Sequence, residues 1–237
     1  MNQTFTIPDG KQAVFELGES ARATFIGRTY KTLLGAIVAF VLIEVALFQT
    51  ALPMKSLEFL AGGRWRWLLF LGGFMVLGSL ATRMAVSARS QAAQLAALVA
   101  YVLLQALIFM PLLVVAQHYA DGGVIESAAL VTLAAFAGLT AIVFVTRKDF
   151  SFLRGIVMYG MLVALIAIVA GVIFDFQLGV WFSAGMVGLA GAAILYDTSN
   201  ILHRYPEDSH VAAALQLFAS VALMFWYVLM LFMSGRD

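Results

Sequence analysis

The chain has 237 residues, of which 63% are hydrophobic and only 11% are charged, and its net charge is +1. Soluble domains carry about 25% charged residues, so this composition excludes a soluble protein and is typical of one that crosses a membrane many times. The small net charge gives no electrostatic reason to expect a nucleic-acid partner. The absence of cysteine excludes thiolate catalysis, disulfides and cysteine zinc sites.

Seven apolar runs are long enough to cross a bilayer, which takes about 20 residues. A backbone in lipid must satisfy its own hydrogen bonds, so we expect all seven to be helices. The sequence therefore predicts an all-α bundle of seven transmembrane helices, divided into a cytoplasmic tail (1–31) and a membrane domain (32–237). In chain order the predicted spans are 32–52, 67–87, 93–116, 124–146, 153–174, 177–197 and 212–234.

The distribution of lysine and arginine predicts the orientation, because cytoplasmic loops carry the excess of these residues. Ten of the fourteen basic residues fall on the side of the N-terminal tail: Lys11, Arg22, Arg28, Lys31, Arg83, Arg89, Arg147, Lys148, Arg154 and Arg204. The opposite side has Lys55, Arg64, Arg66 and Arg236. We therefore expect a multi-pass protein of a bacterial inner membrane, with a cytoplasmic N-terminus and a periplasmic C-terminus, in contact with membrane lipid.

Three ionisable residues at membrane depth are candidate gating or pH-sensing groups, because a charge in the bilayer is costly and is usually functional. Glu44 lies about 18 Å into the first span, where either a structural hydrogen bond or a place on an ion path would explain it. Arg83 and Asp197 both fall at cytoplasmic ends of spans. They could form an ion pair that latches a gate and breaks on protonation, or Arg83 could reach the interface while Asp197 is a hydrated helix end.

Other polar residues have structural explanations. Asp175 falls in the short turn before the sixth span, where a turn or N-cap role is expected, and Glu126 suits the positive end of a helix. The three histidines lack metal-ligand spacing, the serines lack a histidine partner, and no glycine-rich phosphate loop is present. We therefore expect no enzyme activity, no metal site and no cofactor.

Two motifs at span ends carry a resemblance to a known family. Thr146-Arg-Lys-Asp-Phe-Ser-Phe-Leu153 opens the fifth span, and Tyr196-Asp-Thr-Ser-Asn-Ile-Leu-His203 closes the sixth. Together with the final Arg236-Asp237, they resemble the Bax inhibitor-1 (TMBIM) family, over roughly residues 30–234. The resemblance is strongest to bacterial members that modulate the membrane protease FtsH. It implies a fold in which six helices surround a central seventh.

The resemblance also implies two activities, which stay open as alternatives. Some members are pH-sensitive calcium leak channels, in which an aspartate near the end of span six shares a proton-sensitive hydrogen bond with one in span seven. Asp197 matches the first aspartate, but Ser220 is the nearest match to the second, so the paired sensor and strong Ca²⁺ binding are in doubt.

The other implied activity is modulation of FtsH by a competing substrate. Residues 1–25 would then be the segment that binds the protease, unless the tail has no partner. The sequence favours FtsH modulation, with a leak of Ca²⁺ or H⁺ gated near Asp197 as the alternative.

Overall fold

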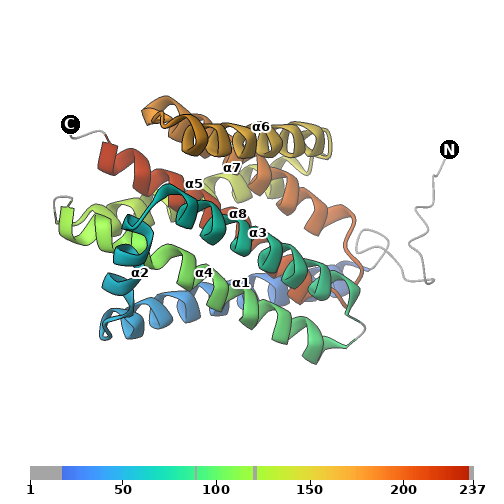
Figure 1. Ribbon diagram of the computed structural model, residues 1–237. Coiled ribbons are helices and arrows are strands. Elements are labelled where there is room, and N and C mark those ends of the chain that lie inside the picture. Colours follow the sequence, from blue (N-terminus) through green and yellow to red (C-terminus); the bar gives the residue numbers. More distant parts are fainter. Residues whose placement is uncertain (1–17, 89, 120–121, 235–237) are drawn as a thin grey trace.

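The computed structural model describes residues 18–88, 90–119 and 122–234, all of which belong to helices or their connections. Lys11, Arg89, the final Arg236-Asp237 and most of the suspected FtsH-binding tail lie outside the described residues. The helices of the described part, drawn in Figure 1, are α1 (Glu19–Phe48), α2 (Leu52–Ala61), α3 (Arg64–Ser87), α4 (Gln91–Tyr119), α5 (Val124–Thr146), α6 (Leu153–Phe174), α7 (Gly179–His203) and α8 (His210–Ser234).

The prediction of seven membrane-spanning helices is confirmed, because every helix except α2 is long and apolar enough to cross a bilayer. The limits of α5 and α6 coincide with the predicted runs. The first span differs most: α1 begins at Glu19, whereas the apolar run predicted a start at residue 32. The earlier turns are more polar, but Phe25 and Thr29 within them are buried against the rest of the bundle.

The ten-residue helix α2 was not predicted and replaces part of the expected loop between the first two spans. Pro53, near its start, suits the first turn of a helix, where no backbone N–H partner is needed. Figure 1 shows α2 lying crosswise to the spans at one end of the bundle. There Leu60 is buried, while Gly63, at φ 148°, allows the chain to turn into α3.

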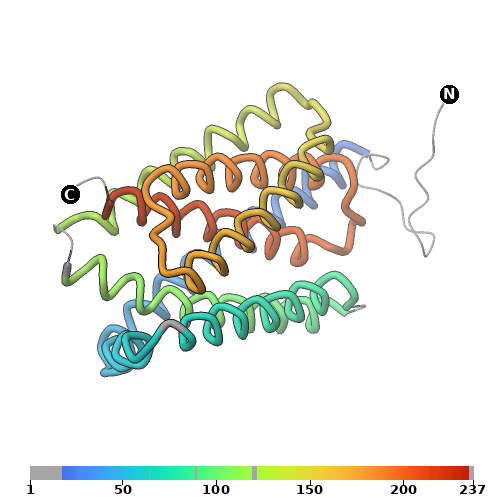
Figure 2. The backbone as a smooth tube through the Cα atoms, turned by 45° about the horizontal axis from the view of Figure 1, so that its top comes forward, coloured from blue at the N-terminus to red at the C-terminus, as the bar shows by residue number. Residues whose placement is uncertain are grey.

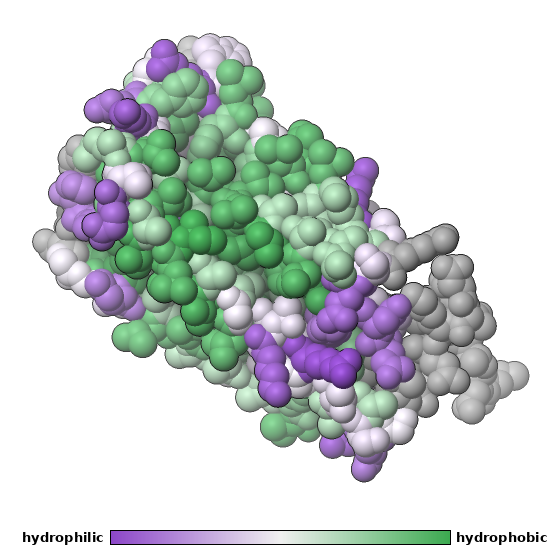
Figure 3. All heavy atoms as spheres, turned by 90° about the horizontal axis from the view of Figure 1, so that it is seen from below, coloured by the Kyte–Doolittle hydropathy of each residue, from purple (hydrophilic) through white to green (hydrophobic). Residues whose placement is uncertain are grey.

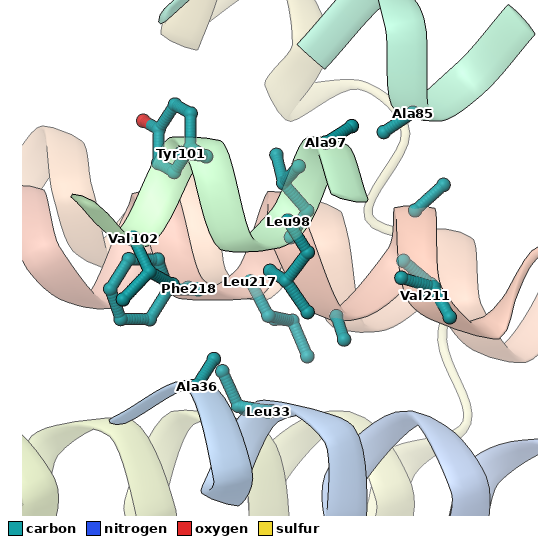
Figure 4. Packing of buried hydrophobic residues seen from close by; sticks show 14 of the residues in the cluster. Leu33, Ala36, Ala85, Ala97, Leu98, Tyr101, Val102, Val211, Leu217 and Phe218 are labelled. Atoms are coloured by element: carbon teal, nitrogen blue, oxygen red, sulfur yellow. The ribbon is translucent and has the colours of Figure 1, made fainter. Parts of the chain in front are cut away.

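Helix α8 is central, as the family resemblance implies. It packs against α1, α3, α4, α5 and α7, while α6 packs mainly on the outside of α7. Figure 4 shows side chains of α8, including Leu217 and Phe218, between those of α1 and α4. Close approach is possible because α8 begins with a run of buried alanines that follows Val211.

The surface and the chain direction fit a membrane protein. A broad apolar belt separates two polar ends in Figure 3, and the exposed large side chains include Leu34, Leu69 and Trp181. In Figure 2, α1 begins at one end of the bundle and α8 finishes at the other, as an odd number of spans requires.

Candidate functional site

Asp197 forms a buried hydrogen bond with Ser220 at the contact between α7 and α8. The hydroxyl of Ser220 donates to Oδ2 of Asp197 at 2.5 Å, and the two residues are only 5% and 3% exposed. A six-residue loop makes the two helices antiparallel neighbours, which brings residues 23 positions apart in sequence to the same depth. Ser220, named from the family pattern, is therefore the side-chain partner of Asp197.

Polar groups continue from this pair towards the loop that joins α7 to α8. Thr198 and Ser199 are also buried, on the last two turns of α7. Burial, reinforced by the nearby carboxylate of Asp197, raises the pKa of the Tyr205 phenol above its usual range. Tyr205 therefore stays neutral next to the Asp197–Ser220 pair.

Of the two alternatives for Asp197 and Arg83, neither the ion pair nor a hydrated Asp197 is found in the described part of the chain, where Asp197 is buried. Arg83 is exposed on α3, and in the part of the chain that the structure describes α3 packs on α4, α6 and α8 without touching α7. Its side chain instead lines a cavity of about 560 Å³ that also includes Gln216 and Ala219 of α8. These two residues precede Ser220 by one turn or less, so Arg83 faces the neighbouring surface of α8.

Glu44 belongs to a different region of the bundle. It is 6% exposed, and within the described ranges neither oxygen of its carboxylate has a hydrogen-bond partner. It lines a second cavity, of about 660 Å³, between α1, α4, α5 and α8. Glu44 therefore faces this cavity, and the structural hydrogen bond considered for it is absent from the part of the chain that the structure describes.

The two family motifs come together at one end of the molecule. Oδ1 of Asp149 accepts a hydrogen bond from the Ser151 N–H (2.9 Å), and the Ser199 hydroxyl oxygen accepts one from the Phe150 N–H (3.0 Å). The Ser199 hydroxyl also reaches Oδ1 of Asp149 at 3.5 Å, and Arg204 pairs with Oδ2 at 3.2 Å. Hydrogen bonds and an ion pair therefore join the α5–α6 loop to the end of α7. The sequence did not predict this contact.

Opposing effects on the pKa of the Asp149 carboxyl favour its ionised form. Partial burial acts against ionisation, but the hydrogen bonds from Ser151 and the positive charge of Arg204 outweigh it and hold the pKa of Asp149 below its usual value. The backbone supports the same geometry, because Arg147 adopts a left-handed conformation (φ 51°) that ends α5 and turns the chain towards Asp149. Spacing within the first motif could have suggested the hydrogen bond from Ser151 to Asp149, but not the contact between the two motifs.

The turn residues behave as expected, and the structure decides between the two roles considered for Asp175. Glu126 lies in the first turn of α5, as predicted. Asp175 is in the predicted turn but is not an N-cap: it ends α6 in a left-handed conformation (φ 57°). Among the described residues no group of three or more histidines and carboxylates could hold a metal ion. One carboxylate and one hydroxyl are also too few for Ca²⁺, which takes six to eight oxygens.

The fold defines a class of protein: an all-helical protein whose described part has seven helices long and apolar enough to cross a membrane, with the last helix central. Residues 22–237 match the family described as Inhibitor of apoptosis-promoting Bax1. The chain belongs to this Bax inhibitor-1 family.

Three bacterial proteins are similar in sequence to this chain. A protein of Pseudomonas aeruginosa is 39% identical over 118 residues, which are 49% of this chain and 53% of the relative. The Modulator of FtsH protease YccA of Escherichia coli K12 is 36% identical over 118 residues, which are also 49% of this chain and 53% of the relative. A protein of Neisseria meningitidis serogroup A is 32% identical over 131 residues, 54% of this chain and 57% of the relative. The chain thus spans about half the length of the curated relatives it matches, and no solved structure matches it.

Proposed function

We propose that this inner-membrane protein modulates the membrane protease FtsH by binding it as a competing, slowly processed substrate. The observation that carries the proposal is the 36% identity to the Modulator of FtsH protease YccA. The polar residues that precede α1, on the side with the excess of lysine and arginine, supply the segment that FtsH would engage from the cytoplasm. The well-packed bundle that follows would slow processing.

The helical start of α1 changes how this proposal should be tested. Deleting residues 1–25 would remove the first turns of α1 and the buried Phe25, so a loss of binding could reflect misfolding. The sharper variant replaces residues 2–17 with a glycine-serine segment of equal length and leaves α1 intact. We expect it to lose co-purification with FtsH while its thermal unfolding stays unchanged. Equal recovery of FtsH by the variant and the natural chain would contradict the proposal.

A second candidate function, a pH-sensitive cation leak, is favoured by one observation. A carboxyl buried at the contact of two membrane helices and held by a single hydroxyl is a group whose protonation could change helix packing. The test is flux of Ca²⁺ or H⁺ through liposomes containing the natural chain or Asp197→Asn. Faster flux in the variant or at lower pH would support a gate at Asp197, whereas flux equal to that of empty liposomes would exclude it.

A further inference from the structure

Helices α1 and α5, together with the end of α4, border a cavity over α8. Both pack on α8, but within the described ranges their backbones make no close contact with each other. Near the start of α1 the gap is closed by Tyr30, whose ring lies 6.4 Å from that of Phe136 and 5.8 Å from that of Phe144. Near the end of α1 no such bridge closes the described part of the gap, and the cavity of about 660 Å³ lies there.

The polar groups of this cavity are acidic or neutral. Glu44 of α1 is buried with both carboxylate oxygens unpartnered, and the hydroxyl of Thr132 on α5 is also buried without a partner. Glu126 adds a second carboxylate from the exposed first turn of α5. The described residues that line the cavity include no lysine, arginine or histidine, so nothing on its walls neutralises Glu44.

The remaining walls are apolar and rich in aromatic rings. Phe40 and Phe48 come from α1, and Phe218 and Phe225 come from α8. Aromatic faces attract organic cations, and a cavity of several hundred cubic ångströms is of the size that holds a small molecule. A buried carboxylate without a partner is costly, so a cation beside Glu44 would relieve that cost, whereas a lipid tail would not.

We propose that this cavity binds a lipophilic organic cation, with its ammonium or phosphonium centre beside Glu44 and its apolar body between α1 and α5. A bare divalent metal ion is a poorer occupant, because the walls supply too few oxygens for its coordination shell. Neither Asp197 nor Ser220 lines this cavity, and its proposed occupant is a small molecule, so the inference does not depend on the proposed function.

The test measures equilibrium binding of tetraphenylphosphonium to the full chain in detergent micelles, after subtraction of the uptake by empty micelles. The Glu44→Gln variant keeps the shape and removes the charge. We expect it to bind about tenfold more weakly or worse, because the attraction between charges is strong beside a carboxylate that is only 6% exposed. Glu58→Gln is the matched control, since Glu58 is exposed on α2 and outside the cavity. It should bind as the natural chain does.

A neutral probe and a second variant separate the effect of the Glu44 charge from the effect of the cavity volume. The neutral dye 1-N-phenylnaphthylamine should bind equally to the natural chain and to Glu44→Gln. Ala129→Phe fills the cavity from α5 while keeping Glu44, and it should weaken binding of both probes. The proposal is overturned if Glu44→Gln binds tetraphenylphosphonium as the natural chain does, if that variant loses both probes equally, or if Ala129→Phe changes neither.

Discussion

At the scale of single residues, the polar pairs of this protein differ in how much solvent surrounds them. The Asp197–Ser220 hydrogen bond is buried between two membrane helices, whereas the Asp149–Arg204 ion pair is about half exposed, at 50% and 43%. Ser220 is the side-chain donor to Asp197 among the described residues, and a buried carboxylate left without a donor costs about 1–3 kcal/mol, while exposed ion pairs contribute about 0–1 kcal/mol. We therefore expect the first pair to affect global stability and the second only local order.

Replacing Ser220 with alanine should lower the free energy of unfolding by about 1–2 kcal/mol, because the Asp197 carboxylate loses its donor. Thermal unfolding of the purified protein in detergent measures this loss. Ser79→Ala is the control, since the Ser79 hydroxyl is exposed and bonds only to a carbonyl of its own helix. A Ser220→Ala variant as stable as that control would show that the buried bond adds nothing.

The Asp149 contact should depend on pH. Its folded pKa lies below the unfolded value of about 3.9, so its stabilisation is fully present above that value and is lost as the pH falls through the folded pKa. Hydrogen exchange of residues 147–153 should show less protection below about pH 4 than at pH 7. Asp149→Asn should show the reduced protection already at pH 7, and Asp175→Asn should not. Protection independent of both pH and Asp149 would refute this assignment.

At the scale of elements, α1 shows best what hydropathy misses. Its first turns contain charged and polar residues, so an apolar-run criterion places the span start at residue 32. The helix nevertheless begins at Glu19, because Phe25 and Thr29 are packed inside the bundle, against residues distant in sequence. The crosswise helix α2 was missed because it is too short and too mixed in composition to be recognised as a span.

The first turns of α1 should therefore contribute to stability although they precede the apolar run. Phe25→Ala should lower the free energy of unfolding by about 3 kcal/mol, since Phe25 is only 2% exposed within the core cluster. Leu34→Ala on the same helix should change little, because Leu34 is 62% exposed on the outer face. Denaturation in mixed micelles compares the two variants, and equal stabilities would mean that residues 19–31 are not part of the folded domain.

At the scale of the whole molecule, the number and order of the spans could be predicted from hydropathy because lipid imposes helices of known length. Hydropathy could not predict which polar groups contact one another, since those contacts depend on how the helices pack. Asp197 and Arg83 were matched by depth alone, yet α3 and α7 make no close contact in the described part of the bundle. Ser220 was found through the family pattern, and the link from Asp149 to Ser199 and Arg204 needed the folded arrangement.

The orientation predicted from the basic residues can be tested directly, because the chain has no cysteine and single cysteines can be introduced. Glu58 lies in α2 at one end of the bundle, and Glu207 lies in the α7–α8 loop at the other, both exposed. In intact cells with a permeable outer membrane, an impermeant maleimide should label Glu58→Cys but not Glu207→Cys. Labelling of Glu207→Cys alone would reverse the orientation.

The packing of α1 has a mechanical consequence if FtsH pulls the chain from its N-terminal end. Force would load α1 before any other span, and α1 is held to α4 and α8 over much of its length by side chains such as Phe25, Leu33 and Ala36. Its first turns would have to lose their contacts with the bundle before the force reached the next span. Helix α1 would then be the first part of the described bundle to resist extraction.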